Sequence, residues 1–223
     1  MSRIDGVIFD VDGTLIDSND AHARAWVAAL AEHGYHVPFE RVRRLIGMGG
    51  DKLLPSVAGI DTDSERGKQI DKRRGAIFQQ RFLPEVGAFP QVRPLLERLS
   101  ADGMRLVVAS SAKGDEIDTL LERTGAADLF ESSTSSSDAP RSKPDPDIVE
   151  AALGQLGLPA GQVLMIGDTP YDVEAAAKAG IGIVALRSGG WGDADLAGAL
   201  AVYDDPADLL AGYDDSPLHQ TLG

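Results

Sequence analysis

The sequence predicts an α/β protein whose core is a doubly wound, Rossmann-like parallel sheet. Short continuous apolar runs, typical of strands buried on both faces of such a sheet, recur along the chain. They lie at residues 7–9, 106–108, 163–166 and 181–184. Helical patterns separate them, at residues 115–123, 145–156, 171–179 and 206–210. This alternation of strand and helix indicates the doubly wound class.

One long segment interrupts the alternation after the first strand. Between about residues 19 and 83 no strand-like run occurs, and apolar residues recur at helical spacing, as at Trp26, Ala29 and Leu30. We therefore predict two domains. Residues 1–16 and 87–223 form a discontinuous catalytic core, and residues 17–86 form an inserted α-helical domain.

A second segment has two interpretations. The stretch "ESSTSSSDAPRSKPDPD", residues 131–147, has the composition of a linker. It also lies between a strand and a helix of the repeating pattern, a position typical of an active-site loop.

Composition restricts the class of partner. The 223 residues are 43% hydrophobic and 25% charged, with no cysteine and a formal net charge of −14. No apolar run approaches the roughly 20 residues of a membrane span, and the N-terminus lacks the features of a secretory signal. We expect a cytoplasmic protein, a monomer or weak homodimer, that binds neither membrane nor nucleic acid. A small phosphorylated metabolite remains possible, because a local cationic site can exist in an acidic protein.

Polar residues follow the predicted strands. Ligands of an open parallel sheet bind outside the carboxyl ends of its strands, so we expect these side chains to meet at one edge. They are Asp10 and Asp12 after the first run, Ser110 and Ser111 after the second, and Asp168 and Asp172 after the third, with Lys143 before the helix that leads into the third.

These residue types indicate phosphoryl chemistry. Asp10, Asp12 and Asp168 would repel one another unless they surround a hard cation, and Mg²⁺ fits carboxylates together with a substrate phosphate. An ionised Asp10 can act as a nucleophile, and Asp12 can handle the proton of the leaving-group oxygen. Ser110 and Lys143 can bind the phosphoryl oxygens.

Four stretches, "FDVDGTL", "VVASS", "KPDPD" and "GDTPYD", resemble the four motifs of the haloacid dehalogenase superfamily in their usual order. The resemblance covers the whole chain, and the insert is similar to the superfamily's small α-helical cap. It implies Asp10 as nucleophile, Asp12 as acid/base, and Ser110 and Lys143 as phosphate ligands. It also implies a Mg²⁺ site formed by Asp10, Asp12, Asp168 and Asp172, with Asp172 holding either Lys143 or a metal-bound water.

Details of the motifs narrow the reaction. True dehalogenases of the superfamily lack a carboxylate at the position of Asp12, so dehalogenation is disfavoured. Transporting ATPases carry a Lys-Thr-Gly sequence after the nucleophile, and this chain has Val11 and Asp12 there. We predict a Mg²⁺-dependent phosphatase that hydrolyses a small phosphate monoester, a sugar phosphate or a phosphoglycolate-like compound, through an aspartyl-phosphate intermediate.

Two alternatives remain. The stretch "HARAW" around His22 and the stretch "SSAK" resemble β-phosphoglucomutase, which favours a phosphosugar mutase. However, "LIGMGGDK" offers glycines and Lys52 where the mutases keep a cation for the second phosphate, and this favours hydrolysis. A catalytically idle binding or regulatory protein is the other alternative.

We expect Ser111, Lys52 and His22 to contribute to substrate binding. His22 is also interpretable as a packing or hinge residue. Residues 47–52 are interpretable either as a flexible turn between cap helices or as a specificity loop that reaches the site when the cap closes.

Overall fold

The computed structural model describes residues 3–219, and the chain divides into two compact units. The first, which we call the core unit, consists of the residues up to Asp17 and those from Ala88 onward. The second, which we call the insert, runs from Ser18 to Gly87. The chain thus leaves the core unit after its first strand and returns to it before the second.

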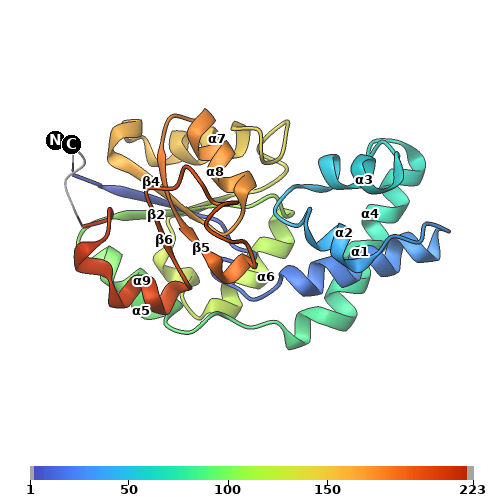
Figure 1. The fold of residues 1–223 in the computed structure, drawn as a ribbon, viewed down its shortest axis with the longest axis horizontal. Helices are drawn as coiled ribbons and strands as arrows, with labels where there is room; N and C mark the ends of the chain where they lie inside the picture. The colour runs from blue at the N-terminus through green and yellow to red at the C-terminus, as the bar shows by residue number, and fades with distance from the viewer. Residues whose placement is uncertain (1–2, 220–223) are drawn as a thin grey trace. The chain divides into compact units, whose positions relative to one another are not determined.

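The core unit is built on a six-stranded sheet in which every neighbouring pair is parallel (Figure 1). Its spatial order is β3-β2-β1-β4-β5-β6. The strands are β1 (Gly6–Phe9), β2 (Arg105–Ala109), β3 (Ser132–Thr134), β4 (Val163–Gly167), β5 (Gly182–Leu186) and β6 (Ala201–Tyr203). The predicted doubly wound α/β class is confirmed.

The chain reverses its direction across the sheet between β1 and β4. Phe9 of β1 pairs with Val108 of β2 on one side and with Ile166 of β4 on the other. The residues that follow these three strands therefore emerge at one edge, at the switch point where open α/β sheets bind ligands.

Helices cover both faces of the sheet (Figure 1). On one face lie α7 (Asp147–Leu156) and α8 (Pro170–Lys178); on the other lie α5 (Val92–Ala101), α6 (Gly114–Thr124) and α9 (Pro206–Ala211). Beneath α7 and α8 the strands contribute fully or almost fully buried apolar side chains to one cluster. Its members include Ile8, Val107, Met165, Ile183, Val149, Ala152, Ala175 and Ala176. Burial of this apolar area is the main favourable term that holds the layers together.

The structure corrects several predicted elements. β3 and β6 were not predicted, because each has three residues, lies at an edge of the sheet and lacks a continuous apolar run. β3 lies inside the Ser-rich segment, so that segment is not simply a linker. The strand predicted at residues 181–184 corresponds to β5, which runs instead from Gly182 to Leu186. The helix predicted from residue 145 begins at Asp147, with Pro146 as its N-cap.

The insert is helical, as predicted, within its described residues. It comprises α1 (Asn19–Glu32), α2 (Phe39–Arg43), α3 (Gly50–Ala58) and α4 (Glu65–Ile77), followed by a π-helical turn at Phe78–Phe82 and a 3-10 turn at Leu83–Glu85. The longest helices, α1 and α4, pack on each other. The buried apolar residues of these two helices are Ala23, Ala25, Trp26, Ala29, Leu30, Ile70 and Ile77.

Residues 47–52 were interpreted from the sequence as a turn or a specificity loop, but the second half of this stretch is helical. Helix α3 begins at Gly50, so Lys52 lies in its first turn rather than in a loop. The three glycines of this stretch lower helix propensity, and for this reason the sequence did not predict a helix here. Leu53, Leu54 and Val57 are buried and fix one face of α3 in the insert.

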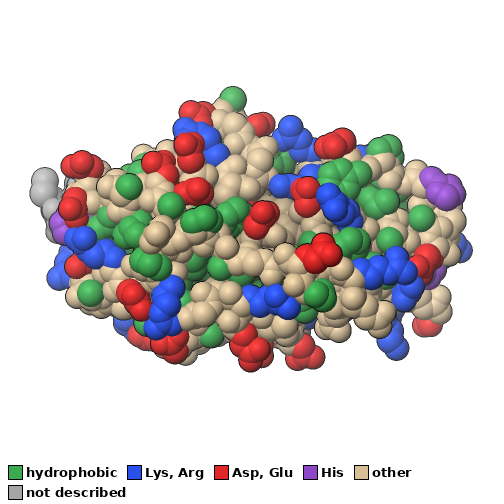
Figure 2. Space-filling view, turned by 90° about the horizontal axis from the view of Figure 1, so that it is seen from below, with side chains coloured by type: hydrophobic (Ala, Val, Ile, Leu, Met, Phe, Trp, Pro, Cys, Tyr) green, Lys and Arg blue, Asp and Glu red, His purple; other side chains and the backbone are tan. Residues whose placement is uncertain are grey.

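Among the described residues, Leu200 is the one large apolar residue that is exposed, with 50% of its surface accessible. Figure 2 shows one face, on which acidic and basic side chains are interspersed with small groups of hydrophobic ones. No helix among residues 3–219 has the length and apolar character needed to cross a membrane.

Candidate active site

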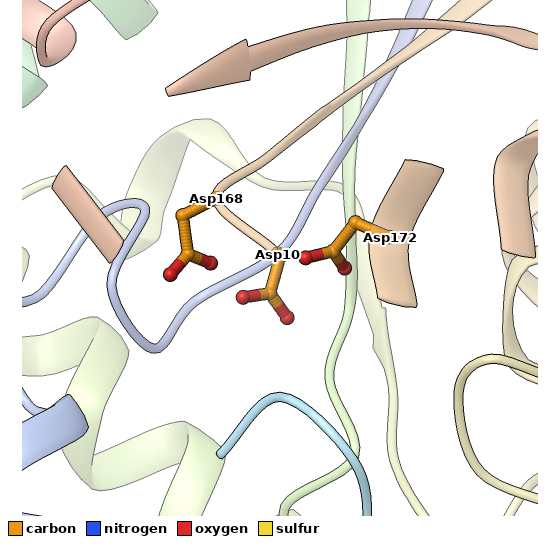
Figure 3. Close-up of side chains that lie close together, drawn as sticks. All are labelled: Asp10, Asp168 and Asp172. Atoms are coloured by element: carbon orange, nitrogen blue, oxygen red, sulfur yellow. The ribbon is translucent and has the colours of Figure 1, made fainter. Parts of the chain in front are cut away.

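Three buried carboxylates meet at the carboxyl edge of the sheet (Figure 3). Asp10 directly follows β1, Asp168 directly follows β4, and Asp172 lies in the first turn of α8. One oxygen from each lies within 4.8 Å of the others. Asp10 is 3% exposed and the other two are fully buried. The sheet therefore holds three groups of like charge together at the place that the sequence predicted.

Lys143 lies against this cluster. Its side chain is fully buried, and its Nζ donates hydrogen bonds to Asp10 Oδ1 and, at 2.7 Å, to Asp172 Oδ1. A longer bond of 3.3 Å reaches the carbonyl oxygen of Ala109, the last residue of β2. The ammonium group therefore bridges a residue after β1, a residue of α8 and the end of β2.

The charges of this group do not balance. With all three carboxylates ionised, one ammonium group would leave two negative charges uncompensated among buried side chains. Burying uncompensated charge is costly, so the donor set favours a divalent cation. All three candidate ligands are carboxylates, the ligand type that Mg²⁺ prefers, and the residues present fit that ion.

Burial also changes the protonation of the cluster. It raises the pKa of Asp10 to about 7; Lys143 opposes this rise, and the charges of Asp172 and Asp12 add to it. Burial alone lowers the pKa of Lys143, but Asp10 and Asp172 outweigh it, so the pKa of Lys143 is raised and the amine stays protonated. A bound cation favours the ionised form of a carboxyl and would bring the pKa of Asp10 down.

Asp172 is held on both oxygens. Its Oδ1 accepts from Lys143, and its Oδ2 accepts from the backbone N–H of Thr169 at 3.0 Å and from Thr169 Oγ1 at 2.6 Å. Thr169 Oγ1 in turn accepts from the N–H of Asp172, which completes a capping box at the start of α8. Of the two roles considered for Asp172, this geometry favours the holding of Lys143.

Asp12 lies outside the three-carboxylate cluster and is half-buried. The turn that follows it requires Gly13, whose φ of 81° lies in the left-handed region. The N–H groups of Thr14, Leu15 and Ile16 all donate to the carbonyl of Val11 and close the turn. Asp12 is therefore placed beside Asp10 on a well-defined backbone, with its side chain more accessible than that of Asp10.

The two predicted serines follow β2. Ser110 is 1% exposed, its N–H donates to Thr134 O of β3 at 3.1 Å, and its Oγ accepts from the N–H of Ala112 at 3.1 Å. A hydroxyl that accepts this bond keeps its own proton for donation. Ser111 is half-buried and one residue further along.

The other two predicted site residues belong to the insert. His22 stacks on Phe78, with ring centroids 4.0 Å apart and an interplanar angle of 12°. This contact supports the packing interpretation of His22. Lys52 is half-buried in the first turn of α3.

Four residues around the carboxylates were not predicted: Thr14, Thr169, Ser188 and Gly189. Thr14 Oγ1 donates to Asp168 Oδ1 at 3.1 Å, and Thr169 caps α8. Thr169 had a sequence signal, because the pattern Thr-x-x-Asp marks a capping box. Ser188 and Gly189 had no such sequence signal, because the pattern of residues 187–192 is typical of a loop at the edge of the sheet.

A family model of haloacid dehalogenase-like hydrolases matches residues 7–186. The chain belongs to this family. Among its relatives is the phosphoglycolate phosphatase of Rhodospirillum rubrum, 34% identical over 91% of this chain and 88% of the relative. The phosphoglycolate phosphatase of Pectobacterium atrosepticum is 31% identical, over 94% of this chain and 92% of the relative. The crystal structure of a hydrolase from Pseudomonas syringae has a TM-score of 0.88 and 32% identity and covers 94% of this chain and 98% of its own.

Proposed function

We propose that this protein is a Mg²⁺-dependent phosphatase that hydrolyses a small phosphate monoester through an aspartyl-phosphate intermediate. The family and the relatives indicate a phosphoric monoester hydrolase. The observation that carries the finer proposal is the buried group of Asp10, Asp168 and Asp172 around Lys143, which combines a nucleophile, a cation site and a fixed ammonium. Because relatives at 31% and 34% identity are phosphoglycolate phosphatases, 2-phosphoglycolate is the first substrate to test.

The carboxylates of Asp10 and Asp168 would hold the metal ion, and the backbone carbonyl oxygen of Asp12 would be a further ligand. Asp172 would hold Lys143 in place. When bound, Mg²⁺ supplies positive charge that offsets the negative charge of the carboxylates and of the substrate phosphate. Lys143 and Ser110 bind the oxygens of the transferring phosphoryl group.

The first half-reaction uses Asp10 and Asp12. A carboxylate oxygen of Asp10 attacks phosphorus, a new oxygen–phosphorus bond forms, and the bond from phosphorus to the alcohol oxygen breaks. Asp12, in its protonated form, gives its proton to that oxygen, and the alcohol leaves. The greater exposure of Asp12 supports this division, because the acid must reach the leaving group and exchange its proton with water.

The second half-reaction reverses these roles. Asp12, now a carboxylate, takes a proton from a water molecule whose oxygen attacks phosphorus. The bond to Asp10 breaks, inorganic phosphate forms, and both carboxyl groups return to their starting states. A mutase would instead pass the phosphoryl group back to a substrate hydroxyl, and the glycines beside Lys52 favour water as the acceptor.

The test measures inorganic phosphate released from 2-phosphoglycolate and from a panel of phosphorylated sugars and small acids. We expect turnover with Mg²⁺, no turnover in excess EDTA, recovery when Mg²⁺ is restored, and no recovery with Ca²⁺, which tolerates looser and higher coordination. Full activity in EDTA would overturn the metal assignment. Inactivity towards every phosphate ester, including an aryl phosphate, would favour the idle binding or regulatory protein.

A further inference from the structure

A short segment after β5 touches both loops that carry the proposed metal ligands. It is the 3-10 turn Arg187–Gly189, which directly follows β5 at the carboxyl edge of the sheet. Ser188 Oγ donates a hydrogen bond of 2.6 Å to the carbonyl oxygen of Gly13. Gly13 follows Asp12 in the turn after β1, so this bond ties the turn to β5 across the position of β4.

Gly189 makes the second contact. It is buried, and a Cβ atom at this position would lie 2.1 Å from Asp168 Oδ2 and 2.6 Å from the Asp168 carbonyl oxygen. Real Cβ atoms do not approach other atoms so closely, so any larger residue would have to displace the Asp168 carboxylate or the segment itself. The need for glycine here comes from the close approach of Asp168.

Asp168 is therefore confined on both of its oxygens. Thr14 Oγ1 donates to Oδ1 at 3.1 Å, and Gly189 lies against Oδ2. The segment that carries Gly189 is itself anchored, because Arg187 Nε and Nη1 donate bonds of 2.7 Å to Asp193 and Asp204. Asp204 directly follows β6, so the anchor extends to the edge strand of the sheet.

We propose that Ser188 and Gly189 are positioning residues for the metal site. Ser188 fixes the turn that places Asp10 and Asp12, and Gly189 leaves the space that the Asp168 carboxylate occupies. Both act through other residues, and neither touches the reacting atoms. This inference rests on the proposed function, because it concerns the same metal site.

A purely structural role would give different results. The loss of a hydrogen bond to a carbonyl destabilises the fold wherever it occurs, whereas the loss of a positioning contact weakens metal binding specifically. Contacts around metal ligands typically change metal affinity by 10- to 100-fold when they are removed. Ser216 offers a matched control, because its buried Oγ donates to the carbonyl of Tyr213 at 2.6 Å in the same unit.

The experiment measures Mg²⁺ binding by titration calorimetry without substrate, together with the midpoint of thermal unfolding and kcat at saturating Mg²⁺. For Ser188→Ala we expect roughly tenfold weaker Mg²⁺ binding. Ser188→Thr, which keeps the hydroxyl, should restore most of that affinity. Gly189→Ala should weaken binding more, because it displaces a ligand directly. Ser216→Ala should lower the unfolding midpoint and leave the Mg²⁺ affinity unchanged.

The outcomes separate the two proposals. If the unmodified protein binds Mg²⁺ and Ser188→Ala binds it equally well, the positioning role is wrong and the metal site stands. If Ser188→Ala and Ser216→Ala lose affinity equally, the effect is general destabilisation, and the positioning role is again wrong. If the unmodified protein binds no Mg²⁺, the proposed metal site fails, and the inference fails with it. Should Gly189→Ala not fold, Ser188→Ala alone decides.

Discussion

The core unit contains 26 Asp and Glu against 10 Lys and Arg, a formal charge of −16, whereas the insert contains 9 against 11, a formal charge of +2. The core unit buries a lysine among carboxylates at the carboxyl edge of its sheet. The insert buries Arg74, whose Cζ lies over the Trp26 ring, 5.5 Å from its centroid. Its Nη2 lies 3.5 Å from Asp71 Oδ1. Among the described residues, each unit thus buries one Lys or Arg side chain, but only the core unit surrounds it with several carboxylates.

This difference separates two requirements of a phosphatase. In the proposed function the residues for bond breaking belong to the core unit, whose strong negative formal charge would repel an anionic substrate. The insert has a formal charge of only +2, and the predicted substrate-binding residues Lys52 and His22 belong to it. Changes in the core unit should therefore act on kcat, and changes in the insert should act on KM and on substrate choice.

The largest expected effect comes from Asp10→Asn. It removes the proposed nucleophile, so we expect kcat to fall by roughly 10⁴-fold or more and no phosphoenzyme to form. Phosphate release and acid-quench trapping of radiolabelled phosphoenzyme measure the two effects. Asp118→Asn, an exposed carboxylate on α6, is the matched control and should change neither. A phosphoenzyme that persists in Asp10→Asn would show that another residue is the nucleophile.

Asp12→Asn should give a smaller loss that depends on the leaving group. The variant keeps the nucleophile but cannot protonate the departing alcohol, so kcat for an alkyl phosphate should fall by roughly 10²- to 10⁴-fold. An activated aryl phosphate needs little protonation, and its first half-reaction should be much less impaired. Burst kinetics on both substrates provide the measurement, and equal losses of the first step would contradict the role of Asp12 as general acid.

In the insert, Lys52→Ala should raise KM with little change in kcat. An exposed or partly exposed charge contributes modestly, so a rise of about two- to fivefold is expected for a substrate with a second anionic group. Lys68→Ala, an exposed lysine on α4, removes the same charge and should have no such effect. A fold-loss in kcat larger than the fold-change in KM would contradict the proposal that changes in the insert act mainly on KM.

The same variant distinguishes hydrolysis from the mutase alternative. With Mg²⁺, β-glucose 1-phosphate and a bisphosphate primer, we expect inorganic phosphate to accumulate faster than glucose 6-phosphate. The opposite order would replace the phosphatase with a mutase. If Lys52→Ala then abolished glucose 6-phosphate formation, Lys52 would be the residue that holds the second phosphate.

The contrast between the units also explains what the sequence could predict. Asp10, Ser110 and Asp168 were placed at one edge because strand ends of a parallel sheet meet there, and the structure has this arrangement. The fold class and the hydrolase family are confirmed by the sheet order and by the comparisons. The roles of the site residues stay predictions. No similar rule places side chains of the insert, where three glycines concealed the start of α3.

Contacts between distant loops were also beyond the sequence. The bond from Ser188 to Gly13 joins residues far apart in the chain, and it depends on the order of the strands. Edge strands β3 and β6 were missed for a related reason. Half-buried strands of three residues carry too little apolar pattern to be distinguished from loops.

The smallest expected effect concerns stability of the core unit far from the site. Tyr213 is 1% exposed, and its OH donates to Asp102 Oδ2 at 2.8 Å. This bond, aided by Arg98, holds the pKa of Asp102 below its ordinary value of 3.8 despite some desolvation. Tyr213→Phe should therefore lower the free energy of unfolding at pH 7 by about 1 kcal/mol, with kcat unchanged.

The pH dependence of that loss provides a sharper test. A carboxyl whose pKa is lower in the folded state stabilises the protein above its ordinary pKa, and this contribution disappears as the pH falls through the folded-state pKa. The difference in unfolding free energy between the unmodified protein and Tyr213→Phe should therefore be constant from pH 7 to about 5 and narrow below about 4. Urea denaturation at several pH values measures it, and Tyr203→Phe, which removes a hydroxyl from β6, is the control. A difference that stays constant at acidic pH would show that the Tyr213 hydroxyl stabilises the protein without involving the charge of Asp102.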